Sequence, residues 1–170
     1  ARDYVHSDMA TNQKEGEWLP MRCLILPETL KYIEDSAFTH CHDLETVICY
    51  APLENTHRGL FEECKGLKTV IFVNGVGEMD NYLFNYCKNL KTVWWKGKVN
   101  RIGVQCFGAT GLEQLCVNAK NIDSCAFIGC EDLKEIHIRS GVENLNMTAF
   151  AMLTGIETIC LEGIDPDVME

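Results

Sequence analysis

Hydrophobic residues recur along the chain in a fixed pattern. Each copy has a phenylalanine, then small or apolar residues at intervals of three, and then two apolar residues separated by one other residue. The pattern is plainest where CKGLKTV (64–70) is followed by CKNLKTV (87–93). Successive phenylalanines lie 23, 23, 23, 20 and 23 residues apart. A fixed period of this size is typical of a solenoid. The phenylalanines that we expect to form a structural column are Phe38, Phe61, Phe84, Phe107, Phe127 and Phe150.

The end of each repeat predicts a short strand. Its last two apolar residues alternate with period two and are rich in β-branched and aromatic types, which favours a strand with one buried face. The degenerate segment MRCLIL (21–26) supplies a seventh copy of this strand. The part before the strand has apolar residues at intervals of three, which suits a helical or 3₁₀ turn. The innermost strand positions vary widely in volume, so we expect a bent or irregular stack there: Cys49, Phe72, Trp95, Val117, Ile138 and Leu161.

One repeat buries too few side chains to offset the entropy of ordering its backbone, so the copies must stack. We therefore predict an α/β solenoid, a leucine-rich repeat right-handed superhelix. About seven strands form a parallel sheet on one face, with short helical or 3₁₀ turns on the other. We expect an N-terminal segment over 1–19 that caps the solenoid or is disordered, the solenoid over 20–164, and an acidic C-terminal end over 165–170. The shorter spacing from Phe107 to Phe127 predicts a second irregularity.

The sequence motif A-F-x-x-C-x-x-L-x-x-I-x-I occurs from Ala37 to Cys49 and from Ala126 to Ile138. It resembles the BspA-like leucine-rich repeats of bacteria and some protists. The resemblance covers roughly residues 20 to 164. It implies a secreted or cell-surface protein that acts in adhesion and protein recognition, and it carries over no catalytic residue. The chain departs from the family pattern by its many cysteines and by the cysteine missing from FGATGL.

Composition and charge limit the classes of partner that the chain can bind. The chain is 46% hydrophobic and 24% charged, with a net charge of −10. Binding to nucleic acid or to an anionic membrane surface requires a cluster of basic residues, so the acidic net charge disfavours both partners. No apolar run approaches the length of a membrane span, so no membrane insertion is expected.

The ten cysteines follow the repeat. We predict that four of them form a ladder of packed, free thiols, since small buried side chains suit this position; disulfides between adjacent coils are the alternative. Free thiols also fit the cytoplasm or an anaerobic setting, so the compartment stays open. The chain has no paired C-x-x-C spacing, and we expect no metal and no cofactor. The ladder residues are Cys41, Cys64, Cys87 and Cys130.

One segment, His40-Cys41-His42, invites a catalytic interpretation. A cysteine nucleophile needs its base within hydrogen-bond reach, whereas adjacent side chains in a tight turn diverge. We therefore predict a protein that is not an enzyme and keep a thiol-dependent enzyme as the least favoured alternative.

The residues between the inward strand positions point outward. Their central row is apolar from Ile25 to Trp94, which is unusual for an exposed sheet face. Another chain or the N-terminal segment could cover this row, or it could reflect strand propensity alone. We predict that it binds a protein or peptide partner, and a homodimer or structural spacer is the alternative. The candidate partner-binding residues are Ile25, Ile48, Ile71, Trp94, Lys91, Lys96, Cys116, His137 and Arg139. Trp95 points inward as a structural residue.

Overall fold

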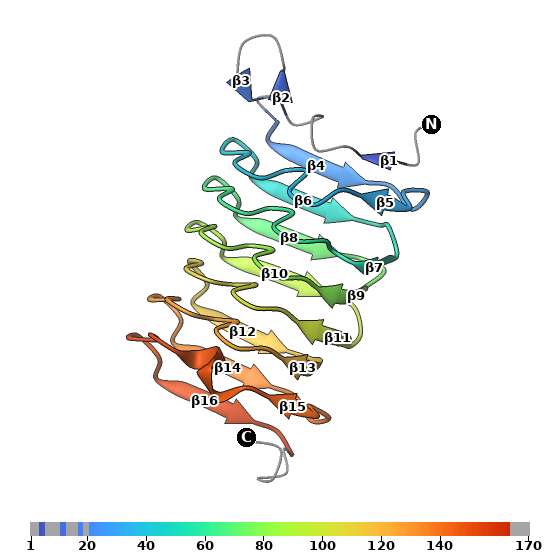
Figure 1. Ribbon diagram of the computed structural model, residues 1–170. Coiled ribbons are helices and arrows are strands. Elements are labelled where there is room, and N and C mark those ends of the chain that lie inside the picture. The colour runs from blue at the N-terminus through green and yellow to red at the C-terminus, as the bar shows by residue number, and fades with distance from the viewer. Residues whose placement is uncertain (1–3, 6–10, 13–16, 19–20, 164–170) are drawn as a thin grey trace.

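The computed structural model describes residues 4–5, 11–12, 17–18 and 21–163. These residues form an elongated stack of similar coils (Figure 1). The seven predicted strands lie one above another in a long column: β4 (Cys23–Leu26), β6 (Thr46–Cys49), β8 (Thr69–Phe72), β10 (Thr92–Trp95), β12 (Gln114–Val117), β14 (Glu135–Ile138) and β16 (Thr158–Leu161). Every bonded pair in this column is parallel. The predicted solenoid class and its parallel strands are confirmed.

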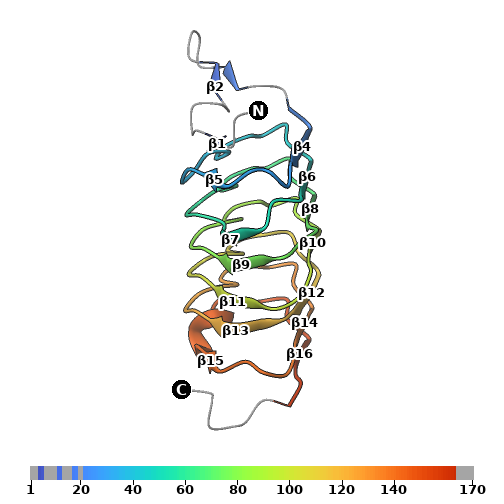
Figure 2. The same cartoon turned by 90° about the vertical axis from the view of Figure 1, so that its right-hand side faces the viewer.

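A second column of strands runs along another side of the stack (Figure 2). Our sequence reasoning did not predict these strands, although pairs such as Val76 and Met79 recur with the repeat. Both members of this pair are buried. The five strands form one continuous sheet: β7 (Leu53–Asn55), β9 (Val76–Met79), β11 (Val99–Ile102), β13 (Ala119–Ile122) and β15 (Asn144–Leu145).

The N-terminal strands are short. β1 (Tyr4–Val5) pairs in parallel with β5 (Tyr32–Ile33), and β2 (Thr11–Asn12) pairs antiparallel with β3 (Glu17–Trp18). The backbone of residues 4–5 therefore joins the first coil. Residues 165–170, for which we expected an acidic end, lie outside the described residues.

Turns with left-handed backbone occupy the third side of most coils. In five of the six phenylalanine repeats, the residues two positions before and two positions after the phenylalanine have positive φ. Left-handed residues interrupt a helix. Of the helical turns that we expected, the described residues therefore form only the 3₁₀ helix η2 (Met147–Phe150). No helix in the described part of the chain is long and apolar enough to cross a membrane. The pairs are Ser36/His40, Gly59/Glu63, Tyr82/Tyr86, Gln105/Ala109 and Cys125/Gly129.

The core consists of ladders of like residues, as the repeat predicts. The six phenylalanine rings follow one another with centroids 5.5–6.0 Å apart, within the usual range for interacting rings. Beside them Cys41, Cys64, Cys87 and Cys130 are all buried. Three of these thiols donate a hydrogen bond to the phenylalanine carbonyl of the preceding coil, for example from Cys64 Sγ to Phe38 O at 3.0 Å. The ladders therefore fix how successive coils align.

Candidate functional site

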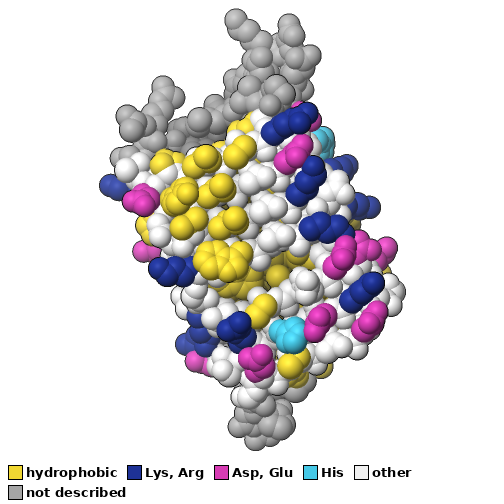
Figure 3. All heavy atoms as spheres, turned by 180° about the vertical axis from the view of Figure 1, so that it is seen from behind, with side chains coloured by type: hydrophobic (Ala, Val, Ile, Leu, Met, Phe, Trp, Pro, Cys, Tyr) yellow, Lys and Arg dark blue, Asp and Glu magenta, His cyan; other side chains and the backbone are white. Residues whose placement is uncertain are grey.

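The outer side of the long column carries the predicted row of side chains. Ladder pairing aligns Ile25, Ile48, Ile71 and Trp94 in successive strands. The side chains at the two ends of this group, Ile25 and Trp94, are 59% and 51% exposed. Figure 3 shows a hydrophobic patch on this side of the molecule, bordered by charged side chains.

The same alignment continues in the lower strands. Cys116 in β12 pairs with His137 in β14, which pairs with Cys160 in β16. Cys116 is exposed, and the other two are partly exposed. The structure thus places every predicted row residue on the outer face, while Trp95 on the inner face is only 7% exposed.

The long column is not one sheet. It divides into a four-stranded sheet that ends at β10 and a three-stranded sheet that begins at β12. Figure 1 shows the wider separation between these two strands. On the second column, β9, β11 and β13 remain hydrogen-bonded through the same coils, so the coils separate on one side only.

The cause of this division lies in the shortened repeat. From Phe107 to the start of β12 at Gln114 is seven residues, whereas the other repeats have eight, as from Phe84 to Thr92. The Phe84 and Phe107 rings are also tilted by 37°, while the other ring pairs are within 17° of parallel. The missing residue and the large Trp95 side chain, which lies in the preceding coil, together explain why β12 does not pair with β10.

Backbone groups face the gap from both sides. In a parallel ladder, the N–H and C=O of alternate residues point to opposite neighbours. Lys96 N donates to Phe72 O on the β8 side, so Val93 and Trp95 direct their backbone groups toward β12. Arg139 N donates to Val117 O on the β14 side, so Cys116 faces β10. Within the described residues, no strand ladder uses these facing groups.

A cavity of about 510 Å³ opens at the division. Its lining includes four of the predicted partner-binding residues, Lys91, Trp94, Cys116 and Arg139, together with residues that our sequence reasoning did not single out. The sequence feature that could have pointed to the residues we did not single out is the shortened repeat. It indicates an irregularity but not where the sheet opens. These additional residues are Thr92, Val93, Gly97, Gln114, Leu115 and Asn118, together with Trp95, which we expected only in the core.

The charged groups at the cavity are already paired. Lys91 Nζ lies 2.9 Å from Glu113 Oε1, and this hydrogen bond raises the pKa of Lys91 and lowers that of Glu113. Arg139 Nε donates to Cys116 Sγ at 3.1 Å, which raises the pKa of Arg139. Lys96 is exposed but does not line the cavity.

The histidine–cysteine segment has the predicted divergent geometry. Cys41 is 4% exposed and belongs to the thiol ladder. His42 is exposed, and its Nδ1 lies 3.1 Å from the carbonyl oxygen of Glu63. His40 Nδ1 lies 3.4 Å from Glu63 Oε2. The two rings therefore contact the neighbouring coil at the surface.

Comparison with solved structures identifies the fold. The T. pallidum leucine-rich repeat protein is similar with a TM-score of 0.77 and 21% identity, over 86% of this chain and 71% of that one. A leucine-rich repeat protein from Bacteroides ovatus has a TM-score of 0.58 and 19% identity, over 86% and 46% of the two chains. A leucine-rich cell surface protein from Faecalibacterium prausnitzii has a TM-score of 0.55 and 22% identity, over 85% and 33%.

At these identities the likeness establishes the fold alone. The chain spans less than half the length of the Bacteroides ovatus protein and a third of the Faecalibacterium prausnitzii protein. No curated protein matches the sequence. Residues 17–121 and 115–165 match the BspA type leucine-rich repeat region, in six copies. The chain therefore belongs to the BspA-type leucine-rich repeat family.

Proposed function

We propose that this protein is a non-catalytic recognition module that binds a protein or peptide partner through the outer side of its long strand column. The observation that carries the proposal is the open division between β10 and β12, with the exposed Trp94 beside it. An adhesive role at a cell surface fits the Faecalibacterium prausnitzii relative, which is described as a cell surface protein.

The division suits an extended peptide. Strand addition takes its affinity from main-chain hydrogen bonds and its specificity from the pockets that receive alternate side chains. The unused backbone groups of Val93, Trp95 and Cys116 supply such donors and acceptors. The cavity between the strands receives a side chain of the peptide.

Trp94 is the expected energetic centre. Tryptophan is enriched among interface residues whose truncation costs the most affinity. The side chain is half exposed in the free protein and adjoins the apolar Ile71 in the next strand. Binding at the division covers both and removes apolar surface from water.

Selection of random linear peptides on the immobilised protein tests the proposal. The affinity of a selected peptide is then measured by fluorescence anisotropy. We expect Trp94→Ala to weaken binding at least tenfold. The matched control is Tyr86→Ala, because Tyr86 is a similarly exposed aromatic residue in the turn after Phe84. This control is expected to leave affinity unchanged.

Amide hydrogen exchange locates the peptide. Protection of the Val93, Trp95 and Cys116 amides on binding supports strand addition at the division. Equal affinity for the Trp94 and Tyr86 variants, or protection confined to the turns, contradicts the proposal. A concentration-dependent homodimer in sedimentation that Ile25→Lys abolishes would instead favour self-association, since Ile25 is the most exposed isoleucine of the row.

A further inference from the structure

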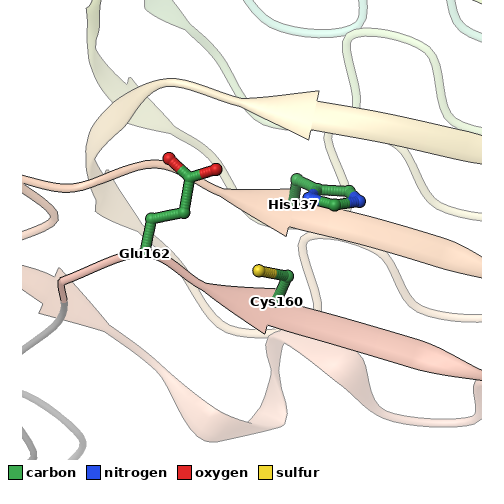
Figure 4. A group of neighbouring side chains, drawn as sticks. All are labelled: His137, Cys160 and Glu162. Carbon is green, nitrogen blue, oxygen red and sulfur yellow. The ribbon is translucent and has the colours of Figure 1, made fainter.

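Below the division, the outer row brings together three side chains with metal-binding atoms. They are His137 in β14, Cys160 in β16, and Glu162 just after β16. One ligand atom from each lies within 4.8 Å of the other two. Figure 4 shows the three side chains together on neighbouring strands. We propose that His137, Cys160 and Glu162 form a zinc-binding site.

The parallel ladder places these residues side by side. His137 and Cys160 are register partners, so their backbones lie about 4.8 Å apart. Glu162 is two residues beyond Cys160 and therefore faces the same side. Its backbone N–H donates to Ile138 O at 2.8 Å, which extends the alignment past the end of β16.

A carboxylate already orients the histidine. His137 Nε2 lies 2.6 Å from Glu135 Oε1. Histidines that bind metals usually donate their other ring N–H to such a group, which fixes the tautomer and the ring. With Nε2 held by Glu135, Nδ1 of His137 is the nitrogen left to bind the ion.

The donor set favours zinc. Thiolate, imidazole and carboxylate are its three usual protein ligands, at about 2.0–2.3 Å from the ion. The present separations of up to 4.8 Å are wider than a bound ion requires, so the partly exposed His137 and Cys160 and the exposed Glu162 would have to move closer when the ion binds. Three protein ligands leave one tetrahedral position for water or a partner's side chain.

Cys116 is not assigned to the site although it is the register partner of His137. Its Sγ accepts a hydrogen bond from Arg139 Nε at 3.1 Å. This thiol is thus already engaged by the guanidinium group of Arg139, whose positive charge also acts on the Glu162 carboxylate. Cys116 therefore serves as a matched control, because it is an exposed cysteine in the same row.

Titration of the reduced, full chain with Co²⁺ tests the site, because a Co²⁺–thiolate bond gives a sulfur-to-metal charge-transfer band. We expect one equivalent to bind, zinc to displace it, and the band to disappear in Cys160→Ser. His137→Ala and Glu162→Ala are expected to weaken binding at least tenfold. Glu135→Gln is expected to weaken it roughly tenfold to a hundredfold, as the loss of an orienting partner usually does.

Cys116→Ser and Cys23→Ser control for the other exposed thiols. Both are expected to keep the band at full strength. Circular dichroism of each variant establishes that the coils remain folded. Absence of a charge-transfer band in the wild-type protein, or a band that survives Cys160→Ser, would falsify the assignment.

Discussion

Trp94 and Trp95 are adjacent in the chain but lie on opposite faces of β10, and their side chains are 51% and 7% exposed. Trp95 pairs in register with the fully buried Phe72. Trp94 pairs with Ile71 on the outer face. The two tryptophans thus mark the inside and the outside of the solenoid at the point where the long column divides.

The two tryptophans should respond differently to truncation. Trp95→Ala leaves a cavity in the core and is expected to cost about 3–5 kcal/mol of unfolding free energy. Trp94→Ala removes an exposed side chain and is expected to change stability by no more than about 0.5 kcal/mol. Thermal or urea unfolding of the two variants compares them directly. If Trp94→Ala lost more unfolding free energy than Trp95→Ala, the assignment of the inner and outer faces would be wrong.

The cysteines should divide into slow and fast classes toward a thiol reagent. Cys41, Cys64, Cys87 and Cys130 are buried in the ladder, and attack by a reagent requires an accessible thiolate. Cys116 is exposed on the outer row. We expect Cys116 to react much faster than the four ladder cysteines, and partly exposed Cys160 to follow it. Mass spectrometry of timed alkylation measures the rates at each position, and equal rates for all five would contradict the ladder.

Alkaline pH should destabilise the solenoid. Burial raises the pKa of Cys49 to about 11, and it also raises the pKa of Cys87 and Cys130. The thiols of the unfolded chain have a pKa of about 8.5. A raised folded pKa stabilises the fold fully below the unfolded pKa, and this stability is lost as pH rises toward the folded value.

Each such thiol is therefore expected to lower the unfolding free energy by about 1.4 kcal/mol per pH unit once the pH exceeds its unfolded pKa. Urea unfolding under reducing conditions between about pH 7 and pH 10 measures the slope. Cys49→Ala is expected to reduce the slope. A pH-independent free energy in wild type over this range is the contrary result.

Two glycines should differ in their tolerance of alanine. A Cβ on Gly66 would lie 2.1 Å from the carbonyl oxygen of His42 in the preceding coil. Gly129 has positive φ, at 66°, but a Cβ there meets nothing within 4 Å. Gly66→Ala must push two coils apart and is expected to cost more than about 3 kcal/mol. Gly129→Ala bears only the left-handed backbone strain of about 1–2 kcal/mol. Chemical denaturation measures both, and similar losses would contradict the close approach at Gly66.

The repeating phenylalanines and cysteines determined most of the fold by themselves. A single period with matched apolar positions leaves stacking as the only way to bury them, so the ladders could be predicted without coordinates. The alternation in β10 likewise assigned Trp94 outward and Trp95 inward, because side chains alternate with period two. The left-handed residues around five of the six phenylalanines could not be predicted in this way, since Glu63, Tyr82 and Tyr86 are not residues that favour positive φ on local grounds.

Only the tertiary structure decided where the long column opens. The sequence shows that the repeat containing Phe107 is short. Whether the missing residues tighten a turn or separate two strands depends on how Trp95 packs and on the second sheet, which holds the coils together on the other side. The grouping of His137, Cys160 and Glu162 is decided in the same way. Residues more than twenty positions apart become neighbours only through the register of β14 and β16, because strand pairing, not chain distance, sets which side chains meet.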